Sequence, residues 1–253
     1  MMLTNVRYIF LTALRDWLFA ALMVGVIVCA LISHMLGSTS IIETQEMTLS
    51  FTAASSRIVI MVGLIVFICF HVQSAFDTKE IDVFLSRPIT RASLVMSYWL
   101  GFAGVALLLV LPTAGLIMVQ GLLNKPGFVI WSASLLLECW VLVTVALLAA
   151  FVLRSVVTSV MASMGFYVVA RMMGFFVAMA GSPSSAHHGH CLSGCTLKTV
   201  STLLPPLDSF ARSEWLISGM ADTNELKRMA LHSVLFMIVV ILMTVVGFKR
   251  KQF

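Results

Sequence analysis

The chain has 253 residues, of which 60% are apolar and only 11% carry a charge. Soluble domains are usually closer to half apolar and a quarter charged, so this composition excludes a soluble enzyme and a disordered chain. The net charge of +5 comes from 16 Lys and Arg against 11 Asp and Glu. In a membrane protein such an excess points first to orientation rather than to nucleic-acid binding.

Six charge-poor blocks are each long enough to cross a bilayer, because a spanning helix needs about 20 apolar residues. The blocks are too long for transmembrane β-strands and do not alternate in polarity. We therefore expect an all-α integral membrane protein that forms a single transmembrane domain. The six expected spans cover about 17–36, 58–76, 94–122, 128–153, 156–180 and 226–248.

The first segment, 1–16, has the pattern of an amphipathic helix. One helical stripe holds the apolar residues Leu3, Val6, Phe10, Ala13 and Trp17. The polar residues Thr4, Thr12, Arg15 and Asp16 lie on the other side. Such a helix can lie in the headgroup plane before the chain enters the bilayer. The alternative is that the first span simply starts early.

Orientation follows from the basic residues, which gather on the cytoplasmic side. With a cytoplasmic N-terminus, that side holds Arg7, Arg15, Lys79, Arg87, Arg91, Arg154, Lys249, Arg250 and Lys251, and the outside holds Arg57, Lys125, Lys198, Arg212, Lys227 and Arg228. The balance of nine against six predicts a multi-pass protein of the inner (cytoplasmic) membrane with both termini in the cytoplasm.

Two connections are long enough to carry function: a charged cytoplasmic segment at 77–93 and an outer loop at 181–225. The chain has no Walker phosphate loop, no His-Glu-x-x-His and no Gly-x-Ser-x-Gly. We therefore expect no catalytic residues in this chain. Any energised work must draw on a partner or on an ion gradient.

The cytoplasmic segment favours a short helix. Asp77 or Thr78 can cap it, and Pro88 stops it. Ile81, Phe84 and Leu85 then form an apolar face on a helix too short to bury itself, which suits docking into the groove of a soluble partner. The alternative is an ordinary solvated turn that contains a helix.

This segment resembles the loop between helices two and three of the permease subunits of type-2 ABC exporters (ABC-2). In that family an acidic helix is followed by Leu-Leu-Ser-x-Pro-Ile-x-Arg. Glu80 matches the acidic position, and the core matches Phe84-Leu85-Ser86-Arg87-Pro88-Ile89-Thr90-Arg91. Asp82-Val83 and Ser97-Tyr98 depart from the family's usual Gly-Thr and Gly-Lys.

The resemblance implies a membrane-spanning exporter subunit with 77–93 as its coupling segment. The residues that would contact the partner are Glu80, Ile81, Phe84, Leu85, Ser86, Pro88 and Arg91. ATP and Mg²⁺ would bind to a separate ABC ATPase subunit, so this chain itself would need no cofactor. A second copy or a sister permease would complete the transport path in the bilayer.

Two ionisable residues fall inside predicted spans. Glu138 precedes Arg154 by 16 residues, and Arg171 follows it by 17. Because the two spans are joined by a short turn near Arg154, antiparallel packing places both side chains at nearly the same depth. A lone charge there is unfavourable, so we expect an intramembrane Glu138–Arg171 ion pair. It could act as a gate or substrate contact, or solely hold two spans together.

The outer loop concentrates sulfur and imidazole groups in His187, His188, His190, Cys191 and Cys195. These ligand types suit zinc or copper. Outside the cytoplasm, Cys191 and Cys195 could instead form a disulfide. A loop without either feature is the third alternative.

Two other classes of function compete with the exporter subunit. One is a partner-independent secondary transporter or channel, which favours several intramembrane ionisable groups, broken helices and repeated halves. The other is a metal-handling membrane protein that uses the outer His/Cys loop. The sequence leaves the transported substrate open, and also the choice between a homodimer and a heterodimer.

Overall fold

The computed structural model describes residues 2–37, 44–78, 90–118, 126–153, 155–180, 204–205, 207–210 and 223–250. All regular secondary structure in these residues is helical. The helices are α1 (Met2–Arg15), α2 (Trp17–Gly37), α3 (Thr44–Asp77), α5 (Arg91–Ile117), α6 (Pro126–Val152), α7 (Val156–Ala180), α9 (Leu207–Phe210) and α11 (Thr223–Arg250).

Five of these helices, α3, α5, α6, α7 and α11, are long and apolar enough to cross a membrane. The described part of the chain is therefore compatible with an all-helical, multi-pass membrane protein. Helices α1 and α2 meet at Asp16 with a bend of 61°, and counting this bent pair as one span gives six. The position of α1 in the headgroup plane stays a prediction.

Helix α3 begins well before the expected second span. The sequence suggested a loop up to Arg57, whereas the helix already starts at Thr44 and runs for 34 residues. Hydroxyl groups explain the difference, because Thr52 and Ser56 donate to the carbonyls four residues earlier, at 2.7 Å and 2.6 Å. A polar stretch thereby satisfies its own side chains without leaving the helix.

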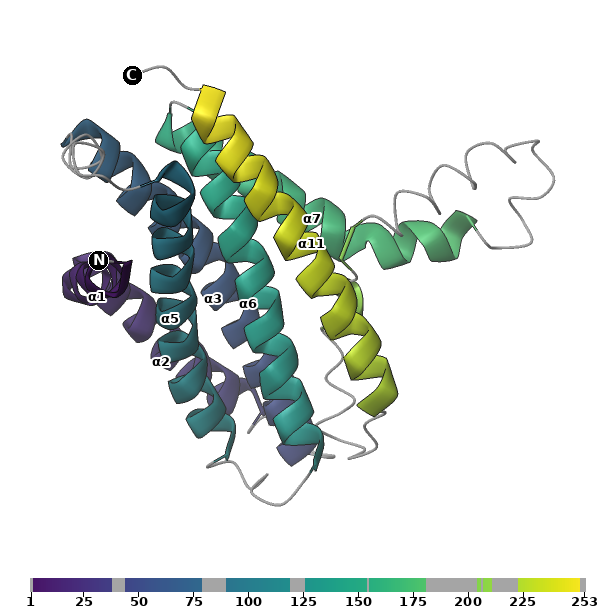
Figure 1. The fold of residues 1–253 in the computed structure, drawn as a ribbon. Helices are drawn as coiled ribbons and strands as arrows, with labels where there is room; N and C mark the ends of the chain where they lie inside the picture. Colours follow the sequence, from purple (N-terminus) through teal and green to yellow (C-terminus); the bar gives the residue numbers. More distant parts are fainter. Residues whose placement is uncertain are drawn as a thin grey trace.

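Helix α6 lies at the centre of the bundle (Figure 1) and packs against α3, α5, α7 and α11. In the 18-residue apolar stretch of α6, 72% of the residues are buried inside the chain, compared with 17% in that of α7 and 28% in that of α11. The packing of the fourth span beside the fifth, expected from the short turn near Arg154, is present, since α6 contacts α7; α6 also contacts α5. The bundle is therefore organised around one nearly covered helix.

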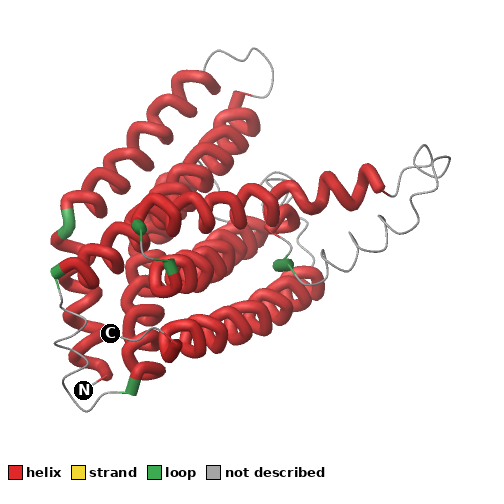
Figure 2. The backbone as a smooth tube through the Cα atoms, turned by 90° about the horizontal axis from the view of Figure 1, so that it is seen from above, coloured by secondary structure: helices red, strands yellow, loops and turns green. Residues whose placement is uncertain are grey.

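The last part of α7 projects away from the other helices, as both views of the backbone show (Figures 1 and 2). Its surface there is apolar, with Met172, Phe175, Phe176 and Met179 all exposed. By contrast, the first half of α7 faces the bundle through Ser163 and Tyr167, which are buried. The two halves of α7 thus have different surroundings within this chain.

Candidate functional site

Three charged side chains meet inside the bundle and form what we call the ionic cluster: Arg57, Glu138 and Arg171. Glu138 on α6 is fully buried and uses both carboxylate oxygens. Its Oε2 accepts a hydrogen bond from Arg57 Nη1 at 2.9 Å, and its Oε1 accepts one from Arg171 Nη1 at 3.3 Å. The carboxylate therefore bridges α3 and α7.

The cluster lies in the middle of α6. Glu138 is 12 residues after Pro126 and 14 before Val152, which corresponds to about 18 Å and 21 Å of helix on either side. At such a depth in a bilayer, charged groups are usually paired or face a polar cavity. The geometry around Glu138 provides that pairing.

Arg57 is the most enclosed member of the ionic cluster. Its side chain is 2% exposed, and its guanidinium lies 5.4 Å from the ring centroid of Trp131. Besides Glu138, it donates to the carbonyl of Phe210 and, at 3.3 Å, to Ser134 Oγ. These partners come from α6 and α9, so one guanidinium joins three helices.

Helix α9 closes the cluster from the segment that precedes α11. Leu207 and Phe210 are fully buried, and their carbonyls accept hydrogen bonds from Arg171 and Arg57, respectively. The short helix lies so close to α7 that a Cβ on Gly174 would overlap Asp208 Oδ2. Glycine at this position therefore leaves room for the present conformation of the Asp208 side chain.

The ionic cluster is asymmetric in charge and in exposure. Two guanidinium groups share one carboxylate, and the Arg171 side chain is 30% exposed while the side chains of Arg57 and Glu138 are almost completely buried. Asp208 of α9 lies against Gly174, which is about one helical turn after Arg171 on α7. Its side chain is exposed and forms no ion pair among the described residues. The Arg171 side of the cluster is thus its accessible side.

The predicted contact between Glu138 and Arg171 is present, but the sequence-based reading missed Arg57. That residue was assigned to the outer loop and counted among six outer basic residues; its burial leaves five. The available signal was the continuing helical spacing of small and apolar residues at Leu49, Ala53, Ser56 and Ile60, all of which are buried. The orientation of the chain in the membrane stays a prediction.

Of the predicted coupling residues, only Arg91 belongs to the part of the chain that the structure describes. It is the first residue of α5, and its Nη1 donates to the carbonyl of Phe248 at 2.9 Å. Its guanidinium also lies 5.5 Å from the Phe248 ring centroid. The other predicted coupling residues lie outside the described residues: Glu80, Ile81, Phe84, Leu85, Ser86 and Pro88.

Phe248 belongs to an aromatic cluster at the same end of the bundle. Its ring lies 5.2 Å from Phe151 and 6.5 Å from Phe76, and Phe151 also contacts Tyr98 at 5.7 Å. These four residues come from α11, α6, α3 and α5. Arg91 therefore attaches the start of α5 to a point where four spans meet.

The candidate metal and disulfide residues also lie outside the described residues: His187, His188, His190, Cys191 and Cys195. Within the described ranges, no three His, Cys, Asp or Glu side chains gather as a metal site would require. The described cysteines, Cys29, Cys69 and Cys139, are free thiols.

The chain matches no known protein family, and no curated protein resembles it significantly in sequence. What the fold itself establishes is an all-helical arrangement, in the described residues, with several helices long and apolar enough for a multi-pass membrane protein.

Proposed function

We propose that this chain is the membrane-spanning permease subunit of an ABC exporter, energised by ATP hydrolysis in a separate ATPase subunit. The segment between α3 and α5 carries the family-like sequence Phe84–Arg91. The observation that carries the proposal is the hydrogen bond from Arg91, the last residue of that sequence, to Phe248 near the end of α11.

This bond supplies a mechanical connection. A partner that displaces the segment before α5 also displaces Arg91, and with it the end of α11. Phe248 packs on Phe151 of α6, the helix that holds Glu138. Movement at the docking segment can therefore reach the centre of the bundle through packed side chains.

The ionic cluster is the gate in this proposal. Arg57 and Arg171 hold the carbonyls of α9, so α9 can leave the bundle only when both sets of hydrogen bonds break. A substrate path would open on the exposed side of Arg171. In this proposal a second permease copy or a sister subunit forms the opposite wall, against the apolar surfaces of α7 and α11 that this chain leaves uncovered.

A second candidate is an ion-driven transporter that needs no ATPase. The observation that favours it is the presence of three ionisable side chains at one depth, because such groups commonly mark ion pathways in membrane proteins. The two candidates differ in whether a soluble partner is required.

The test is to express the tagged chain together with its native genomic neighbours and to purify it in mild detergent. The exporter proposal expects a stoichiometric ATPase that is lost in Glu80→Lys. The matched control is Glu46→Lys, the same charge reversal in the first turn of α3 at the other end of that helix, which should retain the ATPase.

Arg91→Gln provides a third arm. Because the Arg91 guanidinium is engaged with Phe248 inside the chain, we assign it to that contact instead of to the partner contact that the family resemblance implied. This variant should therefore retain the ATPase while weakening the attachment of α5 to α11. A folded, monodisperse sample that carries no ATPase would contradict the exporter proposal and favour the ion-driven candidate.

A further inference from the structure

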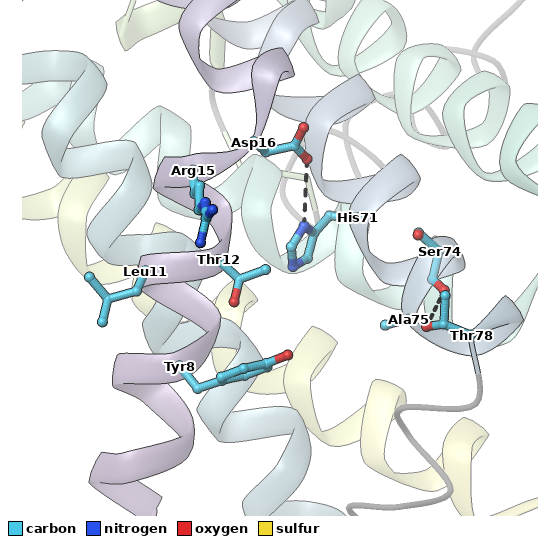
Figure 3. Close-up of a pocket in the computed structure, with 9 residues that line it drawn as sticks. All are labelled: Tyr8, Leu11, Thr12, Arg15, Asp16, His71, Ser74, Ala75 and Thr78. Carbon is cyan, nitrogen blue, oxygen red and sulfur yellow. Dashed lines mark hydrogen bonds and ion pairs between the residues drawn. The ribbon is translucent and has the colours of Figure 1, made fainter.

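A cleft of about 580 Å³ separates α1 from the last turns of α3 (Figure 3). Tyr8, Thr12 and Arg15 line it from α1, and Ser74 and Thr78 line it from α3. On each helix these residues are spaced three or four apart, so each set forms one stripe facing the other wall. Four hydroxyl groups and a guanidinium therefore surround one cavity; the Thr78 hydroxyl donates its proton to the carbonyl of Ser74 at 2.9 Å, so it faces the cavity as an acceptor.

The packing of α1 explains why the cleft stays open. Ile9 and Ala13, on another side of α1, are buried against the bundle. Ile9 fits over Gly101 of α5 so closely that a Cβ there would come within 2.8 Å of Ile9 Cγ2. Because α1 is fastened to α5, it does not close onto α3.

The one carboxylate that lines the cleft is already engaged. Asp16 Oδ1 accepts a hydrogen bond from the backbone N–H of Leu18 at 3.2 Å, which caps the start of α2. Its Oδ2 faces His71 Nδ1 at 3.8 Å, as Figure 3 shows. The neighbouring Arg15 takes part in none of the ion pairs between described residues.

We propose that this cleft binds the phosphate group of an anionic phospholipid. Guanidinium and hydroxyl donors are the groups that recognise phosphate oxygens in proteins. The cleft adjoins the final turns of the apolar span that ends at Asp77, which is the depth of lipid headgroups, and basic pockets between spans bind such headgroups. Leu11 and Ala75 add apolar lining for the carbon atoms next to the phosphate.

The size of the cleft agrees with this ligand, since small-molecule sites have volumes of about 300–1,000 Å³. The inference does not depend on the proposed exporter function. The cleft shares no residue with the ionic cluster, and lipid binding to it is measured on this chain alone.

Native mass spectrometry of the purified full chain, titrated with phosphatidylglycerol, tests the proposal. Arg15→Gln should weaken binding about tenfold or more, as expected for loss of a hydrogen-bonded charge. Arg7→Gln is the matched control, since Arg7 is an exposed arginine of the same helix that does not line the cleft. It should leave binding within about twofold of the unmodified chain, given the small effects of exposed charges away from a site.

A second variant addresses the opposite wall. Ser74→Phe fills the cleft from α3 without altering any charge, and it should also abolish the binding of phosphatidylglycerol in the cleft. Equal phosphatidylglycerol binding by Arg15→Gln and the unmodified chain would overturn the proposal.

Two further ligands define the source of the phosphate. Phosphatidylcholine should bind more weakly, because its choline cation offsets the negative charge; equal binding would overturn recognition of an anionic lipid. Inorganic phosphate should fail to displace phosphatidylglycerol at equal concentration. Displacement at that concentration would assign the cleft to free phosphate and overturn the lipid as ligand.

Discussion

The ionic cluster and the aromatic cluster both join α3 to α6, but they do so by different physics. In the ionic cluster, Glu138 depends on two directional contacts of 2.9 Å and 3.3 Å. In the aromatic cluster, Phe248 packs on rings whose centroids lie 5.2 Å and 6.5 Å away, with different tilts. Ring packing tolerates small displacements, whereas a buried charge does not tolerate the loss of its partner. The contacts at the centre of the bundle must therefore form or break together, whereas the packing at its end can adjust to small changes.

The largest effect is expected from Glu138→Ala. The substitution leaves Arg57 buried without its carboxylate, and breaking a buried pair in this way costs about 3–5 kcal/mol. The chain should lose most of its folded fraction in detergent, which can be measured by thermal unfolding and by size-exclusion chromatography.

The matched variant replaces both partners. Arg57→Met combined with Glu138→Met removes the charge together with its counter-ion, so it should destabilise the chain less than the sum of the two single substitutions. An additive result would contradict the view that these two residues act as one unit. Glu138→Gln separates the roles further: a folded, assembled but inactive protein would exclude a solely structural role.

Phe248→Ala should come next, at about 3 kcal/mol, because it removes a fully buried ring and leaves a cavity among four helices. Phe248→Leu retains much of the volume and should cost less than about 1.5 kcal/mol. Unfolding titrations with a strong detergent can compare the two. Similar losses from both would mean that ring geometry matters, contrary to the adaptable packing described above.

The difference between the clusters also explains what the sequence could predict. The apolar blocks located five long helices to within a few residues at most ends, because burial in lipid demands long uncharged stretches. The pairing of Glu138 with Arg171 followed from counting residues on either side of a turn. Both inferences use information that lies along the chain.

Arg57 and α9 were harder to place because their positions depend on tertiary contacts. A polar stretch with Thr48, Thr52 and Ser56 resembles a loop. In the structure, the hydroxyl groups of Thr52 and Ser56 are satisfied by carbonyls of their own helix, and both side chains are buried in the bundle. Phe210 takes part in the site through its backbone carbonyl, and a pattern of side chains does not predict such a contact. The sequence alone therefore indicated that the apolar block begins after Arg57, because this residue is a single charge at the edge of the block.

Gln73 combines features of both clusters. It is a buried polar residue, like the members of the ionic cluster, but it lies close to the aromatic end of the bundle. It is 4% exposed, and its Nε2 donates to the carbonyls of Ala150 at 3.0 Å and Leu153 at 3.1 Å. These carbonyls belong to the end of α6, where helical partners are missing.

Gln73→Leu should therefore destabilise the chain by about 1–3 kcal/mol, because it leaves buried acceptors without donors. Hydrogen exchange should also increase in the last turn of α6. Unchanged exchange there would indicate that water replaces the side chain. An exposed control on the same helix is Ser74→Leu, which should change stability by less than about 0.5 kcal/mol.

The smallest effect is expected from Gly174→Ala, although it acts directly beside the ionic cluster. The new methyl group would overlap Asp208 Oδ2, but the exposed Asp208 side chain can rotate away, so the expected loss is about 1 kcal/mol. In an Asp208→Ala background the same substitution should be nearly neutral, because the overlapping oxygen is gone. If the loss persisted there, the methyl group would have to act on the backbone of α9, and the carbonyl of Leu207 would then lose Arg171 as its donor.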